Sequence, residues 1–255
     1  MTAVLCDLDG VVYRDSEPVP GAPEAMEKLL DSGVQVFFIT NNSTRTPEAA
    51  AAKITKLTGV DIAGGQVLTS SQAAVRMLDG TDGPVLVVGE KGLSEVIGAA
   101  GHVVTSDPME ARSVVVGLTR SLTYEIIAGA MQAILNGARF IATNDDTTFP
   151  TEDGLAPGCG AIVAAIAAAT DSSPEVAGKP NPAMRDLIRS KIDGDAWVIG
   201  DRLDTDIALA HGEDGWRSVL VLTGISSEED AGDADYVVDD FPAAVDLVLA
   251  HLKRS

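Results

Sequence analysis

The chain has 255 residues, a formal net charge of −20 and a hydrophobic content of 45%. This length and apolar content are typical of a folded globular protein with one or two domains, and they exclude a disordered chain. The acidic balance argues against nucleic acid and against an anionic membrane surface as partners.

The first predicted element is a short strand that ends in two acids. An apolar run at residues 3–6 is followed by Asp7 and Asp9, and Gly10 then lets the backbone turn away. Because side chains alternate along an extended segment, both carboxylates can point to the same side. Two adjacent acids repel each other unless a cation or a reaction needs them. This pair alone leaves a solvated acidic turn and a functional site equally open.

A strand–helix alternation continues from this first strand. Residues 22–30 predict a helix, and residues 34–40 are nearly all apolar, as in a strand buried on both faces of a parallel sheet. That strand ends in Thr40, Asn41 and Asn42, before a helix at 47–57. A further strand at 66–68 and a helix ending at Leu78 complete this part.

A dense run of Gly, Asp, Thr and Pro at residues 79–84 predicts a domain boundary. Beyond it the alternation restarts and predicts an α/β unit of its own at residues 80–176. Its expected strands are 85–88, 113–116 and 139–143, and its expected helices are 92–100, 123–136 and 160–169, with a loop at 144–158.

The first pattern resumes after a Gly-Lys-Pro segment that contains Lys179. A helix to residue 191 precedes a strand at 196–200, and this strand runs directly into Asp201 and Asp206. Strands at 218–222 and 236–238 and a helix at 241–252 close the chain. Alternating strands and helices predict a parallel sheet covered on both faces, with ligands at the carboxyl ends of the strands.

Every polar cluster noted so far follows such a strand end or a nearby loop. Acids, a lysine and a hydroxyl at adjacent strand tips describe a magnesium and phosphate site, because hard oxygen ligands suit Mg²⁺. Main-chain N–H groups at the turn after Thr40 suit phosphate oxygens, a lysine supplies compact positive charge, and an aspartate can attack phosphorus. Asp204, by contrast, is expected to be an exposed acid without a chemical role.

Cysteines and histidines indicate no other chemistry. Cys6 and Cys159 are too few for a disulfide framework, and the three histidines have no zinc-ligand spacing. There is no signal-like N-terminus, and the longest apolar stretch, residues 161–169, is shorter than the roughly 20 residues that cross a bilayer, so we expect a buried helix there. We therefore expect a cytoplasmic protein.

Four motifs in order resemble the haloacid dehalogenase (HAD) superfamily. They are Asp7-Leu8-Asp9-Gly10-Val11-Val12-Tyr13, Ile39-Thr40-Asn41-Asn42-Ser43, Gly178-Lys179-Pro180-Asn181-Pro182 and Ile199-Gly200-Asp201-Arg202-Leu203-Asp204-Thr205-Asp206-Ile207. Within that superfamily the chain is similar to the large-cap, type IIA phosphatases. The resemblance implies a Rossmann-like parallel-sheet core at residues 1–79 and 177–255, with an inserted α/β cap at 80–176 that selects the substrate.

The resemblance also implies how the acids are used. Asp7 is expected to be the nucleophile and a magnesium ligand. Asp9 is expected to act as general acid and then general base, with its main-chain carbonyl on the metal and a raised pKa. Asp201 is expected to complete the Mg²⁺ site, with Asp206 close behind it.

The remaining motif residues are implied to hold the phosphoryl group. Thr40 and the main-chain amides of Asn41 and Asn42 are expected to bind it, although both asparagines also suit a turn. Lys179 is expected to stabilise the charge on nucleophile and phosphate.

The substrate is implied only as a small phosphorylated metabolite. Cap segments at 117–120, 143–146 and 149–154 are the candidates for choosing it, and the last fits a plain hairpin turn equally well. The second and third segments look most like the phosphatases of phosphoglycolate and glycerol 3-phosphate, with 4-nitrophenyl phosphate as an artificial substrate. Nucleotide and pyridoxal phosphates are alternatives, as is a phosphotransferase or mutase. A receiver-like phospho-acceptor domain is the alternative of another class. A homodimer formed through the cap stays open.

Overall fold

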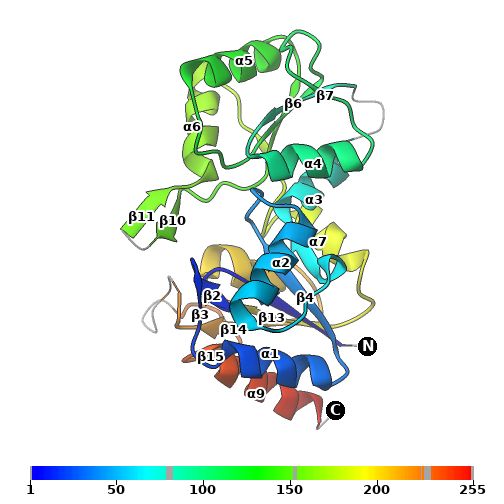
Figure 1. Cartoon of the computed structure of the whole chain (residues 1–255), viewed down its shortest axis with the longest axis vertical. Helices are drawn as coiled ribbons and strands as arrows, with labels where there is room; N and C mark the ends of the chain where they lie inside the picture. Colours follow the sequence, from blue (N-terminus) through cyan, green and yellow to red (C-terminus); the bar gives the residue numbers. More distant parts are fainter. Residues whose placement is uncertain (1, 79–82, 152–153, 225, 227–230, 254–255) are drawn as a thin grey trace. The chain divides into compact units, whose positions relative to one another are not determined.

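The computed structural model describes residues 2–78, 83–151, 154–224, 226 and 231–253. The chain divides into two compact units, each an α/β unit (Figure 1). The first comprises Met1–Thr40, Pro47–Leu68 and Ile188–Ser255, and the second comprises Asn41–Thr46 and Thr69–Leu187.

A six-stranded sheet forms the centre of the first unit. In order across the sheet its strands are β15 (Tyr236–Val238), β14 (Trp216–Val221), β13 (Ala196–Gly200), β1 (Ala3–Asp7), β4 (Gln35–Thr40) and β5 (Val67–Thr69). The pairings from β15 through β4 are parallel. The predicted parallel α/β fold is therefore confirmed, and β13 and β15 have the predicted bounds.

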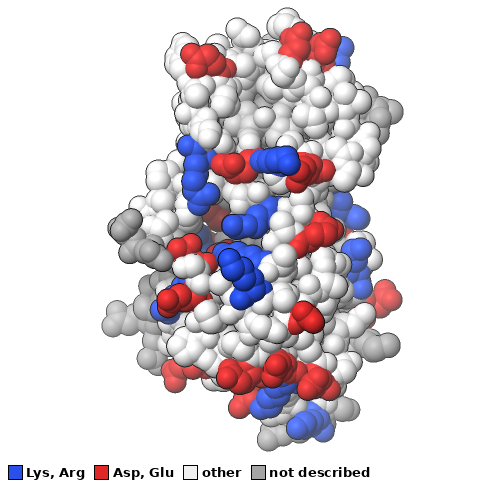
Figure 2. Space-filling model, in the orientation of Figure 1, with Lys and Arg blue, Asp and Glu red and all other residues white. Residues whose placement is uncertain are grey.

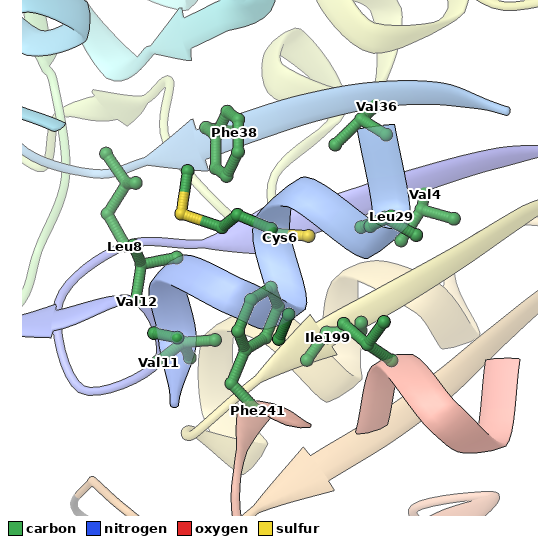
Figure 3. Packing of buried hydrophobic residues seen from close by; sticks show 14 of the residues in the cluster. Val4, Cys6, Leu8, Val11, Val12, Leu29, Val36, Phe38, Ile199 and Phe241 are labelled. Atoms are coloured by element: carbon green, nitrogen blue, oxygen red, sulfur yellow. The ribbon is translucent and has the colours of Figure 1, made fainter. Parts of the chain in front are cut away.

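Burial on both faces explains the apolar run of β1, which lies within the sheet. All five residues of β1 are buried. Val4 and Cys6 join an apolar cluster with Phe38 of β4 and Phe241 (Figure 3). Three helices contribute to this cluster: α1 (Ala22–Asp31), α2 (Pro47–Thr58) and α9 (Phe241–Leu252). A fourth, α8 (Ala208–His211), packs against β13 and β14.

Several short elements of the first unit were not predicted. They are the two-residue strands β2 (Tyr13–Arg14) and β3 (Glu17–Pro18), a 3₁₀ turn at Gly64–Gln66 and a π-helical turn at Leu203–Ile207. None of these segments is a continuous apolar run, the signal that identifies the short core strands, and each is too short for a periodic pattern.

The second unit is built around a five-stranded parallel sheet. Its strands in order are β12 (Glu175–Val176), β9 (Arg139–Ala142), β8 (Ser113–Val116), β6 (Val85–Val88) and β7 (Val104–Thr105). Its helices are α3 (Ser70–Met77), α4 (Lys91–Ala99), α5 (Tyr124–Leu135), α6 (Cys159–Thr170) and α7 (Pro182–Arg189), whose last two residues belong to the first unit. A hairpin of β10 (Thr148–Thr151) and β11 (Gly154–Pro157) precedes α6.

The predicted cap, residues 80–176, falls within the range of this second unit. Of the predicted boundary segment, residues 79–82 lie outside the described residues. The hairpin occupies the loop predicted at 144–158, and β7 and β12 were not predicted. The role of the cap in choosing a substrate stays a prediction.

The apolar helix is only partly buried, unlike our expectation for residues 161–169. Ile162 and Ile166 of α6 are buried, whereas Ala161, Ala164 and Ala168 are exposed. Alanine is small enough to be tolerated on a solvent-facing helix surface, and it is the strongest helix former. Apolar composition therefore predicted the helix correctly but overestimated its burial.

Charged side chains of both signs are visible on the face drawn in Figure 2, so that face is not a field of one sign despite the net charge of −20. Among the described residues, no helix combines the length and apolar character needed to cross a membrane.

Candidate active site

Three buried carboxylates gather in the first unit. Asp7, Asp201 and Asp206 have relative exposures of 6%, 2% and 1%. One carboxylate oxygen from each lies within 4.8 Å of those of the other two. Carboxylates buried this close to one another repel strongly, so the arrangement calls for a cation or for protonation.

The sheet places these acids at one edge. β1 and β13 are neighbours with Cys6 opposite Ile199, so Asp7 and Asp201 follow at the carboxyl ends of adjacent parallel strands. Asp206 lies in the π-helical turn that follows Asp201. Its Oδ2 accepts a hydrogen bond from the Arg202 N–H at 3.3 Å, which orients this carboxylate.

Two glycines make room for the carboxylate of Asp201. Gly10 has φ +93°, a left-handed conformation that suits glycine, and a Cβ there would lie 2.7 Å from Asp201 Oδ2. A Cβ on Gly224 would lie only 1.8 Å from the same oxygen. The Thr223 hydroxyl donates to the Gly10 carbonyl at 2.6 Å and fixes these two loops together. The position of Asp201 thus depends on the absence of side chains at two distant points of the chain.

Asp9 and Thr40 lie beside this cluster in the fold. Asp9 is half-buried just beyond β1, and its main chain forms an isolated β-bridge with that of Tyr13. Thr40, 4% exposed, is the last residue of β4, and its neighbour Ile39 is paired with Asp7. Asp204 is exposed and pairs with Arg202 at 2.8 Å, which confirms the surface position expected for it.

In the second unit the structure brings Asn41 and Lys179 together. Both are buried, and the Lys179 N–H donates to Asn41 Oδ1 at 2.8 Å. Asn42 is half-buried, and its Oδ1 accepts from the Thr44 N–H at 3.0 Å and the Thr44 hydroxyl at 2.7 Å. The Asn42 side chain therefore closes a local turn, in keeping with its interpretation as a turn residue. Phosphate binding through the amides of Asn41 and Asn42 stays a prediction.

The predicted site residues thus form two groups, one in each unit. The first unit holds Asp7, Asp9, Thr40, Asp201 and Asp206, and the second holds Asn41, Asn42 and Lys179. Sequence reasoning missed Gly224, which no local motif marks, and Ser70, whose hydroxyl donates to the Asn41 carbonyl at 2.6 Å. Ser70 was detectable as a polar residue directly after a predicted strand.

Both cysteines are unsuited to nucleophilic chemistry. Burial, together with the negative charge of the adjacent Asp7, raises the pKa of the Cys6 thiol far above its ordinary value. Burial raises the pKa of Cys159 to about 11, although a hydrogen bond from Thr143 partly opposes this. Both are free thiols, and raised pKa values keep them protonated near neutral pH.

Comparison with protein families assigns both ends of the chain to one group. A family model described as haloacid dehalogenase-like hydrolase matches residues 4–102, and a HAD-hydrolase-like model matches residues 176–244. The chain is 39% identical over 229 residues to dihydroxyacetone phosphatase of Corynebacterium glutamicum, covering 88% of this chain and 82% of that protein. It is 37% identical over 230 residues to a 5′-nucleotidase of Bacillus subtilis, covering 88% of each.

A solved structure with the same fold contains a bound metal ion. The glycerol phosphate phosphatase of Mycobacterium tuberculosis in complex with magnesium is 36% identical and superposes with a TM-score of 0.85, covering 95% of this chain and 75% of that one. A match to phosphatases over nearly the whole length excludes the receiver-like signalling domain. The chain therefore belongs to the haloacid dehalogenase-like hydrolases and, within them, to the large-cap type IIA phosphatases.

Proposed function

We propose that this phosphatase is a magnesium-dependent phosphomonoesterase that acts through an aspartyl phosphate on Asp7. The observation that carries the proposal is the cluster of three buried carboxylates within 4.8 Å of one another. Such a cluster is costly to bury without a cation, and oxygen ligands of this kind suit Mg²⁺.

The residues at this edge of the sheet fit a magnesium ion. The carboxylates of Asp7 and Asp201 and the main-chain carbonyl of Asp9 would hold it, and Asp206 would support it from behind. Gly10 and Gly224, which leave space for the Asp201 carboxylate, support this assignment. When bound, the ion supplies positive charge that offsets the repulsion among the acids and neutralises charge on the transferring phosphoryl group.

The chain's own residues then carry the two chemical steps. An oxygen of Asp7 attacks phosphorus while the bond to the leaving oxygen breaks, and Asp9 gives that oxygen a proton. Asp9 next takes a proton from water as the water oxygen attacks phosphorus, which releases inorganic phosphate and restores Asp7. Thr40 and the main-chain N–H groups of Asn41 and Asn42 orient the phosphoryl group.

Lys179 adds positive charge for the nucleophile and the phosphate. Its burial, at 2% exposure, supports a functional role, because a lysine is almost never buried without a partner that needs its charge. Catalysis in this scheme is mostly positioning and charge neutralisation around an in-line transfer.

The proposed substrate is a small phosphorylated metabolite, with phosphoglycolate or glycerol 3-phosphate favoured. The dihydroxyacetone phosphatase and the glycerol phosphate phosphatase among the relatives have names that specify small three-carbon compounds, which supports a small metabolite and, of the two favoured substrates, glycerol 3-phosphate more directly than the two-carbon phosphoglycolate. A nucleotide is the second candidate, favoured by the 5′-nucleotidase relative, and pyridoxal phosphate is a third. We further propose a cytoplasmic protein without nucleic-acid or membrane partners, consistent with two free buried cysteines and the charge of −20. A homodimer formed through the cap stays part of this proposal.

Steady-state turnover of a panel of phosphate esters tests the proposal. We expect magnesium-dependent release of phosphate from 4-nitrophenyl phosphate, with kcat/KM highest for glycerol 3-phosphate or phosphoglycolate in the panel. Asp7→Asn should abolish turnover, because an amide cannot form the acyl phosphate, and the matched Asp204→Asn variant should retain it. Magnesium-dependent turnover by Asp7→Asn would rule out the proposed nucleophile, while a preference for nucleotides would replace only the substrate.

A further inference from the structure

The side chain of Asn41 grips the main chain of Lys179 from two sides. Its Oδ1 accepts the Lys179 N–H at 2.8 Å, and its Nδ2 donates to the Lys179 carbonyl at 3.3 Å. Asn41 and Lys179 are 8% and 2% exposed. A carboxamide nitrogen has two N–H donors, and Asn41 Nδ2 also donates to Asp146 Oδ2, so the side chain is committed to the protein and not to a bound phosphate.

Asn41 is itself held in place. Its main-chain carbonyl accepts from the Ser70 hydroxyl at 2.6 Å and from Asn144 Nδ2 at 2.8 Å. Its Nδ2 also donates to Asp146 Oδ2 at 3.2 Å. The Asp146 carbonyl accepts from the Gly160 N–H at the start of α6 at 2.9 Å, so the partner of Asn41 is anchored too.

Gly178 provides an independent sign that this contact is built into the chain. A Cβ at Gly178 would lie 2.5 Å from Asn41 Oδ1 and 2.6 Å from the Thr143 carbonyl oxygen. The Gly178 N–H donates to that same carbonyl at 2.8 Å. Only a residue without a side chain allows the carboxamide and the Lys179 segment to meet at this distance.

From these contacts, and resting on the proposed role of Lys179, we infer that Asn41 is a positioning residue that sets where the Lys179 ammonium acts. Asp146 accepts a hydrogen bond from the same Nδ2 that donates to the Lys179 carbonyl, and it lies just before the β10–β11 hairpin. One side chain therefore ties the lysine to the segment from which the hairpin starts. Because a lysine acts as a point charge on a flexible stem, its main chain must be fixed if its charge is to be placed accurately.

The test is a double-mutant cycle of Asn41→Ala and Lys179→Met, measured as kcat and KM for 4-nitrophenyl phosphate at saturating magnesium. Asn41→Ala should lower kcat by about 10- to 100-fold with a smaller change in KM, the loss expected from a displacement of about 1 Å. In the Lys179→Met background the same substitution should have almost no further effect on kcat, because the group it positions is gone. Asp146→Ala should show a weaker form of the same pattern, and Asp146→Asn, which still accepts a hydrogen bond, should be restored toward wild type.

Ser71→Ala is the matched control. Ser71 is buried, and its hydroxyl donates to the Ser43 carbonyl at 3.2 Å, so this hydrogen bond braces the segment that contains Asn41 at a different residue. Equal loss of kcat in Ser71→Ala and Asn41→Ala, or an undiminished Asn41→Ala effect in the Lys179→Met background, would overturn the inference and leave the phosphatase standing.

Amide hydrogen exchange supplies a readout that needs no turnover. The Lys179 amide should exchange slowly in the wild type and much faster in Asn41→Ala and Asp146→Ala. An inactive wild type would overturn the proposed function and, with it, the catalytic role inferred for the contact between Asn41 and Lys179. If the wild type is active but the Lys179 amide exchanges equally in all variants, Asn41 does not fix the Lys179 main chain, and only this inference is overturned. If Asn41→Ala does not fold, the comparison of Asp146→Ala with Asp146→Asn tests the inference instead. Asp146→Ala removes only one of the three side-chain hydrogen bonds of Asn41 that the described contacts include.

Discussion

The two units carry the same kind of parallel sheet but end their strands in different chemistry. In the first unit, β1 ends at Asp7 and β13 is followed by Asp201. In the second, β8 is followed by Gly117 and β9 by Thr143, whose hydroxyl bonds the Ser43 hydroxyl at 3.1 Å. Two hydroxyls can satisfy each other by a hydrogen bond, whereas clustered carboxylates call for a cation or for protonation. The strand ends, and not the architecture, therefore distinguish the unit with the proposed metal site from its counterpart.

The contrast extends to how each unit uses buried polar groups. The acids of the first unit repel one another, and a bound cation would relieve that repulsion. The amides and hydroxyls around Asn41 in the second unit are paired within the protein and fix one main-chain segment. The first arrangement is suited to bind and react, and the second to hold a residue in place.

The largest predicted difference between the two units is the loss of magnesium affinity and of kcat/KM when an acid at a strand end is replaced. Asp201→Asn is expected to weaken magnesium binding and to lower kcat/KM by at least about 100-fold. Loss of a residue that only hydrogen-bonds to a metal ligand costs about 10- to 100-fold, and loss of a ligand itself should cost at least as much. Asp206→Asn should cost about 10- to 100-fold on the same basis. Isothermal titration with Mg²⁺ and steady-state kinetics measure both effects.

The matched variant in the second unit is Asp145→Asn. Asp145 is an exposed acid just beyond β9, and its removal should leave magnesium affinity unchanged. Equal loss of affinity in Asp145→Asn and Asp201→Asn would show that the strand-end acids of the two units are equivalent, and the comparison would fail.

A methyl group added beside Asp201 should produce an intermediate effect. In Gly224→Ala the new Cβ would overlap Asp201 Oδ2, so the carboxylate or the loop must shift. We expect kcat/KM to fall by about 10- to 100-fold, since a shift of about 1 Å in a positioned group costs that much.

Gly65→Ala is the control for this substitution. Gly65 lies in the same unit, and a Cβ there meets nothing within 4 Å. Its activity should equal that of the wild type. A Gly224→Ala enzyme with full activity and unchanged magnesium affinity would mean that Asp201 does not need its present position.

The sequence predicted well what depends on local pattern. The strands at 85–88, 113–116, 196–200 and 236–238 have their expected bounds, because each is a short, largely apolar run; those at 113–116 and 196–200 are buried throughout. The convergence of Asp7 with Asp201 followed from parallel topology, which places successive strand ends at one edge.

What could not be predicted depends on contacts between distant segments. The space that Gly224 leaves for Asp201 and the grip of Asn41 on Lys179 join residues more than 20 and 130 positions apart, and no periodicity encodes them. The sequence marked Asn41 as polar and well placed, but it did not distinguish a contact with phosphate from a contact with the protein. Likewise, α6 was apolar throughout, and only the packed structure shows which of its alanines face solvent.

The smallest effect expected concerns the thiols, of which each unit holds one. Cys6 and Cys159 are both buried, and burial raises the pKa of each, that of Cys159 to about 11. A raised pKa keeps a thiol protonated, so at pH 8 only about one Cys159 in a thousand is the reactive thiolate. A disulfide reagent at pH 8 should therefore label neither cysteine of the native protein while phosphatase activity persists, and both should react once denaturant is added. Cys159→Ser assigns the signal to one unit or the other. Rapid labelling of one thiol in the native protein would reveal that its unit opens far more often than its packing predicts, and the two cores would then differ in stability as well as in chemistry.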